Sequence, residues 1–262
     1  MAATSSSSSP ATTSNKEDEL ASLGDLEGLE HDEIQLLRKL KPFDRAIIDI
    51  SYIFISSQAF RKIMELSVET LLAAKFAIKD GTEPASTPLF SIEMKSLQFL
   101  EVHLSNLPLP PNVFLLFKMP NLKILKIASN DYSYCRPCDF KLIRTLVGGS
   151  CCFHLTHLRV ANVEITGSAN PPAARDTTFC ERQRNSMNSS GKDVHLESYT
   201  LFKLLPHLRE LCLPSNAYIH PSTLLLIGEG HLLRRLHRLK LGSASPRLVF
   251  DMVTRRKKCL LQ

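Results

Sequence analysis

The sequence predicts an α/β fold in which parallel strands alternate with helices, and two observations support this prediction. The first is a short pattern, apolar-x-x-apolar-x-apolar, whose clearest copy is Leu97-Gln98-Phe99-Leu100-Glu101-Val102. Its last two apolar positions are two residues apart, so in a strand both side chains point to one face. The second observation is that this pattern returns along the chain, with helix-like segments between most copies.

Four further good copies follow the clearest one, and two weaker copies precede it. The good copies are Leu122/Leu125/Ile127, Leu155/Leu158/Val160, Leu208/Leu211/Leu213 and Leu236/Leu239/Leu241. The weaker copies are Ile47/Ile50/Tyr52 and Leu71/Ala74/Phe76.

The spacing of the copies indicates a repeat architecture. They begin at residues 47, 71, 97, 122, 155, 208 and 236, so the steps are 24, 26, 25, 33, 53 and 28 residues. Four of the six steps match the roughly 20–29 residues of a leucine-rich repeat, and the two longer steps indicate insertions in loops. We therefore expect a leucine-rich-repeat solenoid, with a parallel concave sheet and helices on the convex side.

The chain divides into four expected regions. Residues 1–30 form a Ser/Thr-rich and then acidic arm that has too little apolar content to fold. Residues 31–42 contain a short helix, because apolar residues recur every three positions until a proline ends it. Residues 43–258 form the repeat domain, which includes a long polar loop at 166–194.

Further elements are expected within the repeat domain. Strands are expected at 45–55 and 71–78, and helices at 58–66, 113–117, 140–147, 196–205, 221–227 and 248–253. The pair Gly148-Gly149 is expected to close the helix at 140–147. The terminal repeats show no obvious polar cap, which solenoids normally have.

Composition narrows the class of protein. The chain has 262 residues, of which 44% are hydrophobic and 22% charged, as in ordinary globular domains. Seven cysteines in a chain of this length do not suggest a disulfide framework, so a reducing compartment, the cytoplasm or the nucleus, is expected. No secretory signal is visible, and no apolar run approaches the roughly 18 residues of a membrane span.

Charge is distributed unevenly along the chain. The net charge of +6 combines a net of −7 over residues 1–33, with eight acidic residues and one lysine, and a net of +8 over residues 231–262, with nine basic residues and one acidic residue. Opposed ends of this kind indicate charged partners or attraction within the chain.

Five short segments of the chain form a further pattern: Ser57-Gln58-Ala59-Phe60, Pro88-Leu89-Phe90, Lys95-Ser96-Leu97-Gln98-Phe99-Leu100, Met119-Pro120-Asn121-Leu122 and Pro206-His207-Leu208-Arg209-Glu210-Leu211. These segments resemble the repeat region of fungal F-box proteins with leucine-rich repeats. The resemblance covers about residues 43–245 and implies that the repeats hold a target protein. It also implies substrate recognition for an SCF-type ubiquitin ligase through an adaptor subunit. A complete F-box does not fit before the first strand.

Candidate partner-binding residues follow from the strand pattern, because repeat solenoids bind partners on the exposed strand positions. The position between the last two apolar residues is occupied in turn by Ser51, Lys75, Glu101, Lys126, Arg159, Cys212 and Lys240, and the preceding position adds His157, Glu210 and Arg238. The candidate set is Lys75, Glu101, Lys126, His157, Arg159, Arg238 and Lys240. Because cations predominate, the expected target is an acidic protein. Alternatively, these charges only keep an open sheet face soluble.

The cysteines and histidines raise the possibility of a zinc site. Cys135 and Cys138 have the spacing of zinc ligands, and Cys151, Cys152, His154 and His157 follow them. The two histidines flank an inward leucine and are badly spaced for one metal ion. We expect loop cysteines beside a strand, and no metal or other cofactor.

The basic run Arg255-Arg256-Lys257-Lys258 would suit nuclear localisation or a nucleic-acid contact. No aromatic residue is interleaved to stack on bases, so a solvated tail is the favoured interpretation and nucleic acid an unlikely partner. The sequence shows no phosphate-binding loop, nucleophile elbow or metalloprotease motif. It therefore predicts a non-enzymatic protein-interaction module. The alternative is a nuclear or nucleic-acid-associated adaptor that uses the basic C-terminal end.

Overall fold

The computed structural model describes most of the region expected to fold. The described residues are 29–41, 44–79, 91–105, 114, 116–129, 140–162, 191–214, 217, 219–241 and 245–260. Two predictions lie partly or largely outside them: the disordered arm up to residue 28, and residues 166–190 of the long polar loop.

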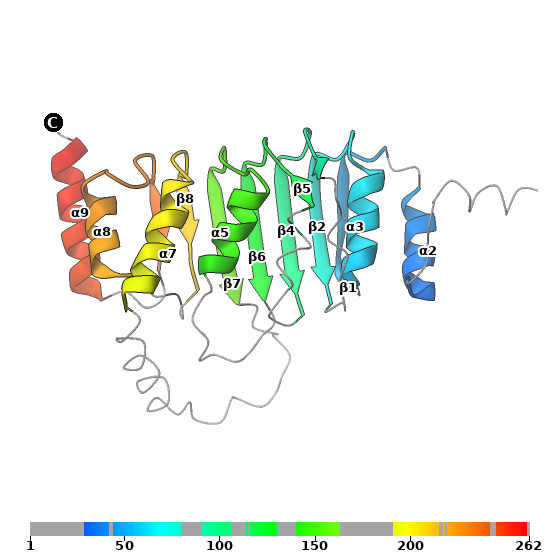
Figure 1. The fold of residues 1–262 in the computed structure, drawn as a ribbon, viewed down its shortest axis with the longest axis horizontal. Helices are drawn as coiled ribbons and strands as arrows, with labels where there is room; N and C mark the ends of the chain where they lie inside the picture. The colour runs from blue at the N-terminus through cyan, green and yellow to red at the C-terminus, as the bar shows by residue number, and fades with distance from the viewer. Residues whose placement is uncertain are drawn as a thin grey trace, which may run out of the picture.

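Seven strands form one parallel sheet, and this coarse prediction is confirmed. The strands are β1 (Ile47–Ile55), β2 (Ala73–Ile78), β4 (Phe99–Leu104), β6 (Ile124–Ser129), β7 (His157–Asn162), β8 (Glu210–Cys212) and β9 (Arg238–Lys240). Their order in the sheet is their order in the sequence, and every neighbouring pair is parallel. Figure 1 shows the sheet extending across the molecule, with β1 near one end and β8 near the other.

The middle leucine of each good copy lies in one row across the sheet. Backbone pairing joins Leu100 to Leu125, Leu125 to Leu158, Leu158 to Leu211, and Leu211 to Leu239. The first four of these side chains have no exposed surface, and the fifth is partly buried. Each fully buried leucine contributes roughly 1.5–3 kcal/mol, so the row is a main source of stability.

The leucine that begins each good copy lies in a turn before its strand. The N–H groups of Leu97, Leu122, Leu155, Leu208 and Leu236 each donate to the carbonyl oxygen three residues earlier, at 2.9–3.4 Å. This shared turn explains why the pattern needs an apolar residue three positions before the strand's first inward residue.

Successive units are joined by shared carbonyl oxygens just before each strand. One carbonyl of each unit accepts the N–H groups of two consecutive residues of the next unit, at 2.7–3.2 Å. The acceptors belong to Ala46, Leu72, Gln98, Lys123, Thr156 and Arg209. The same geometry spans the long steps of 33 and 53 residues, so the insertions leave the strand register unchanged.

The prediction for the first weak copy, Ile47/Ile50/Tyr52, was wrong by two residues. The structure pairs Ile48 with Ala74 and Ile50 with Phe76, so these two isoleucines are the inward residues of β1. Tyr52 is 77% exposed, because a register shift between residues 50 and 54 takes it out of the regular ladder. The apolar run of β1 offered two alignments, and periodicity alone did not distinguish them.

Among the described residues, six helices accompany the main sheet, together with a second, two-stranded sheet. The helices are α2 (His31–Leu40), α3 (Ser57–Leu66), α5 (Phe140–Gly149), α7 (Gly191–Lys203), α8 (Pro221–Gly228) and α9 (Pro246–Leu260). The small sheet pairs β3 (Ile92–Glu93) with β5 (Phe117–Lys118) in parallel. Figure 1 shows α3, α5 and α7 over the same face of the main sheet.

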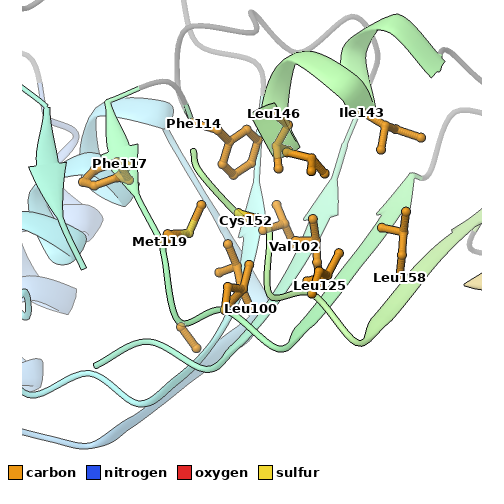
Figure 2. Close-up of a cluster of buried hydrophobic side chains, with 14 of the residues drawn as sticks. Leu100, Val102, Phe114, Phe117, Met119, Leu125, Ile143, Leu146, Cys152 and Leu158 are labelled. Carbon is orange, nitrogen blue, oxygen red and sulfur yellow. The ribbon is translucent and has the colours of Figure 1, made fainter. Parts of the chain in front are cut away.

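The core fills the space between the sheet and this helical layer. Figure 2 shows Leu100, Leu125 and Leu158 of the strands beneath Ile143 and Leu146 of α5. Further along, the Phe60 ring of α3 makes edge-to-face contacts with Phe76, Phe114 and Phe117, with ring centroids 5.0, 5.7 and 5.9 Å apart. Such contacts add about 0.5–1.5 kcal/mol each beyond the area they bury.

Three local predictions were wrong. The helix expected over 113–117 does not extend through Phe117, which pairs in β5 with a two-residue strand too short to leave a pattern. The helix expected over 196–205 begins at Gly191, inside the range assigned to the polar loop, and ends at Lys203. The helix at 140 continues through Gly149, and the left-handed residue after it is Cys151, with φ 57°.

Helix α2 covers the N-terminal end of the stacked repeats, although the sequence showed no obvious cap there. Glu33 of α2 is 4% exposed, and its carboxylate accepts the Ser56 N–H at 2.6 Å and the Ser56 hydroxyl at 3.0 Å. The same carboxylate accepts the N–H of Glu30 at 3.2 Å. Three apolar side chains of this helix join the core. This carboxylate therefore ties the helix to the end of β1.

The C-terminal end is covered by α9, which Arg256 fixes in place. Its guanidinium donates to the carbonyl oxygens of Ile227 at 2.7 Å, Leu233 at 2.9 Å, Arg234 at 2.6 Å and, more weakly, Leu236 at 3.4 Å. One side chain thus caps the end of α8 and holds the turn before β9.

Candidate functional site

One face of the main sheet carries the side chains that point away from the core; we call it the open face. The alternating burial of side chains along β4 shows this face. The half-buried side chains of β4 point to it, and the buried ones point to the core: the half-buried residues are Phe99, Glu101 and His103, and the buried ones are Leu100, Val102 and Leu104. Helices α3, α5 and α7 lie over the other face, where the buried alternate residues pack. A parallel sheet is normally covered on both faces, so a face over which no described helix lies requires explanation.

All seven predicted partner-binding residues lie on the open face. Backbone register places Lys75, Glu101, Lys126, Arg159 and Lys240 in a single row across the sheet. His157 and Arg238 lie in the adjacent row, on either side of Glu210. Asp49, not Ser51, occupies the first place in the long row, because of the shifted alignment of β1.

The N-terminal half of this row is a ladder of alternating charges. Lys75 Nζ lies 2.7 Å from Asp49 Oδ2, and Lys126 Nζ lies 3.1 Å from Glu101 Oε2. His103 Nε2 lies 3.2 Å from the other oxygen of Glu101. Opposite charges on neighbouring strands stabilise a sheet by about 0.2–1 kcal/mol per pair. These four charges therefore largely satisfy one another.

The carboxylates of this ladder have altered proton affinities. The hydrogen bonds from Lys75 and then from Ser51 lower the pKa of Asp49 below its ordinary value. Burial raises the pKa of Glu101, but hydrogen bonds from Lys126 and His103 outweigh it, so the net pKa is also lowered. Both groups are thus held in the charged form at neutral pH.

An apolar row, which was not predicted from the sequence, lies beside the ladder of charges. Ile47, Ala73, Phe99 and Ile124 are neighbours across the first four strands of the main sheet, and Ile47 is 68% exposed. Lys126 Nζ lies 5.0 Å from the centroid of the Phe99 ring, within the range of a cation–π interaction. The signal was present in the sequence, since these residues precede the ladder residues by two positions and so share their face.

The C-terminal part of the open face has a different character. Arg159, Arg238 and Lys240 are exposed there, with Glu210 half-buried and Cys212 buried among them. Arg238 Nη1 lies 3.5 Å from Glu210 Oε2. Cations exceed carboxylates on these three strands, which matches the predicted basic bias.

The cysteines and histidines do not assemble into a metal centre in the described part of the chain, where no group of three potential ligands meets. Cys135 and Cys138 lie outside the described residues. Burial, with a smaller effect of Cys151, raises the pKa of Cys152 to about 12, so its thiol stays protonated. His154 stacks on His207, with ring centroids 5.7 Å apart.

The basic run at 255–258 is not a free tail. It belongs to α9, where Arg255 lies 2.5 Å from a Glu229 carboxylate oxygen and Arg256 holds the backbone carbonyls named above. Only Lys257 and Lys258 of the four remain exposed without an interaction among the described residues. The interpretation as a solvated tail was wrong for the two arginines, because sequence alone did not show which backbone carbonyls lay within their reach.

Comparisons of this chain with protein-family models, with curated proteins and with solved structures give no match. Among the described residues, no helix has the length and apolar character needed to cross a membrane.

Proposed function

We propose that this chain is a leucine-rich-repeat protein that binds a protein partner on the open face, without enzymatic activity. The observation that carries the proposal is a face of the seven-stranded parallel sheet that no described helix covers, with exposed and half-buried apolar and charged side chains in aligned rows. Rows on a rigid, hydrogen-bonded sheet hold their spacing without a partner. Little conformational entropy is then lost when a partner binds.

Support for a leucine-rich-repeat solenoid comes from the repeated hydrogen bonds. Five equivalent turns and six equivalent shared carbonyls recur from unit to unit, although the units differ in length. The middle leucine of the pattern points to the same side in each of the five good copies. Stacked units of this kind leave an extended surface that such proteins use for binding.

The resemblance to fungal F-box proteins with leucine-rich repeats extends the proposal to ubiquitin ligases. The open face would select the substrate of an SCF-type ligase, and an adaptor subunit would connect the chain to that ligase. The described cysteines are free thiols, as expected for a protein of the cytoplasm or nucleus. The alternative adaptor role through the basic C-terminal end has less support, since two of its four cations are engaged within the fold.

The test blocks the open face with two large uncharged side chains. Ala73→Tyr with Ala128→Tyr places two large side chains on half-buried positions of the open face, in residues that suit a strand. The matched control, Gln58→Tyr with Leu196→Tyr, adds the same two residues at exposed helical positions. Circular dichroism and thermal unfolding establish that both double variants fold.

The readout is quantitative affinity capture followed by mass spectrometry, after proteasome inhibition. We expect a set of proteins retained by the wild type and the control and lost from the open-face variant. Equal capture by all three proteins contradicts binding through this face. Adaptor subunits of a cullin–RING ligase in the retained set support the ligase role, and their absence removes that part of the proposal.

A further inference from the structure

The charges of the open face divide the sheet into two halves. From β1 to β6 the central row alternates in sign, and each cation has a carboxylate within 3.1 Å. From β7 to β9 the same row continues as Arg159, Cys212 and Lys240, with no acidic residue in it. The positive excess of the face is therefore concentrated at its C-terminal end.

Two of the cations at this end have no counter-charge in the described part of the chain. Among the described residues, no carboxylate lies within ion-pair distance of Arg159 or Lys240. Glu210 pairs with Arg238 at 3.5 Å, but 70% of the Arg238 side chain stays exposed. Burial, and then the hydrogen bond to Glu210, raises the pKa of Cys212. The residue between Arg159 and Lys240 is thus a neutral thiol, which cancels no positive charge.

We propose that the β7–β9 end of the open face binds an acidic polypeptide segment, whose carboxylates pair with Arg159, Arg238 and Lys240. This inference rests on the proposed function and specifies the chemistry of the partner. The acidic segment would lie across β7, β8 and β9. The paired charges of β1–β6 would contact the rest of the partner without attracting a particular charge.

The spacing of the three cations suits a polypeptide. Arg159 and Lys240 are two strands apart in one row, which places their backbones about 10 Å apart. Arg238 and Lys240 are two residues apart on one strand, about 7 Å. Side chains on one side of an extended segment repeat at about 7 Å, and carboxylates two turns apart on a helix are about 11 Å apart. Both forms of segment can meet two cations at once.

A nucleic acid fits this surface less well. The described residues of β7–β9 have no phenylalanine, tyrosine or tryptophan on which a base would stack. Glu210 also lies in the middle of the patch, where it repels a phosphate backbone that carries one charge per about 1.7 Å of duplex axis. A polypeptide with separated carboxylates can avoid that contact.

The test measures binding of a fluorescein-labelled poly-glutamate peptide by fluorescence anisotropy, at low and at physiological salt. The open-face variant is Arg159→Gln with Arg238→Gln and Lys240→Gln. The matched control is Arg247→Gln with Lys257→Gln and Lys258→Gln, which removes the same net charge from exposed positions of α9. Because exposed ion pairs contribute about a factor of two to five each, we expect a loss of affinity of roughly tenfold to a hundredfold for the open-face variant only.

Each other result overturns the proposal. Equal losses in the two triple variants indicate non-specific attraction to net charge, and no binding by the wild type leaves the patch without the proposed ligand. Tighter binding of a single-stranded oligonucleotide of equal charge, lost in the open-face variant, assigns the patch to nucleic acid. In any of these cases, loss of captured partners from the tyrosine-blocked variant would still support the proposed function, so the two failures are distinguishable.

Discussion

Replacement of Arg256 by methionine tests whether this one side chain holds the C-terminal end of the fold together. Methionine keeps an unbranched apolar stem of similar reach and removes only the guanidinium. Two of the carbonyl oxygens that Arg256 contacts, those of Ile227 and Leu233, are part-buried at 2.7 and 2.9 Å. The other two lie nearer to solvent or accept a longer bond, so water partly replaces the arginine there.

The magnitude follows from the two part-buried bonds. A hydrogen bond from a charged donor contributes about 1.5–3 kcal/mol net, so the two together give at least about 3 kcal/mol. For a chain of this size, 1 kcal/mol shifts the unfolding midpoint by about 2–4 °C, so we expect a decrease of about 6–12 °C if unfolding is cooperative. Arg255→Met is the control, because its ion pair with Glu229 is exposed and contributes about 1 kcal/mol or less.

The assay combines thermal and urea unfolding, both followed by circular dichroism, with amide hydrogen exchange resolved by mass spectrometry. Repeat proteins can open from one end, so exchange should accelerate first in α8 and α9 of the Arg256→Met protein. Equal destabilisation by Arg255→Met and Arg256→Met, or unchanged exchange in α8 and α9, would refute the assigned role.

Three further predictions concern packing, pH and thiol reactivity. Gly228→Ala should lower the free energy of unfolding by about 1–3 kcal/mol, because the new Cβ would lie 2.8 Å from a backbone carbonyl oxygen of α9. Gly148→Ala is the control: its Cβ would lie 3.6 Å from the nearest atom, so it should raise the free energy of unfolding by up to about 1 kcal/mol. Urea unfolding measures both changes. Asp49 and Glu101 have lowered pKa values in the fold, so the stability that they contribute is present above the unfolded-state pKa of about 4 and is lost as the pH falls through the folded-state values. In the double variant Asp49→Asn with Glu101→Gln, the free energy of unfolding in urea should therefore change less between about pH 5 and pH 3 than in the wild type. Cys152, with a pKa of about 12, should resist iodoacetamide at about pH 8, where only about one molecule in ten thousand carries a thiolate.

Each of these predictions has a contradicting result. A stabilising Gly228→Ala would show that α8 and α9 are not in close contact there. An unchanged slope of stability with pH would exclude a net contribution from the charge ladder. Cys259 is exposed and should react in the same experiment, so labelling of Cys152 at an equal rate would contradict its burial.

The strands followed from the sequence because their pattern is local and repeated. An inward leucine recurs at fixed spacing from the turn before it, as in Leu97 with Leu100 and Leu122 with Leu125, so one copy helps to align the next. The candidate residues on the open face followed from the same alternation. The copy in β1 failed because an almost continuous apolar run fits two alignments equally well.

Features that depend on contacts between distant residues could not be predicted in this way. Glu33 is 23 residues from Ser56, and Arg256 is 29 residues from Ile227, so no periodicity relates either pair. An acidic residue in a short helix and an arginine in a basic run both suggest solvent exposure. The uncapped appearance of the two ends had the same origin.

Site-specific photocrosslinking in cells tests the central claim, that the open face binds protein, most directly. A photoreactive phenylalanine analogue at position 128 lies on the open face, and the same analogue at position 58 lies exposed on α3. We predict discrete crosslinked protein products from position 128 that are absent from position 58. Products from position 58 alone, or identical products from both positions, would contradict the account.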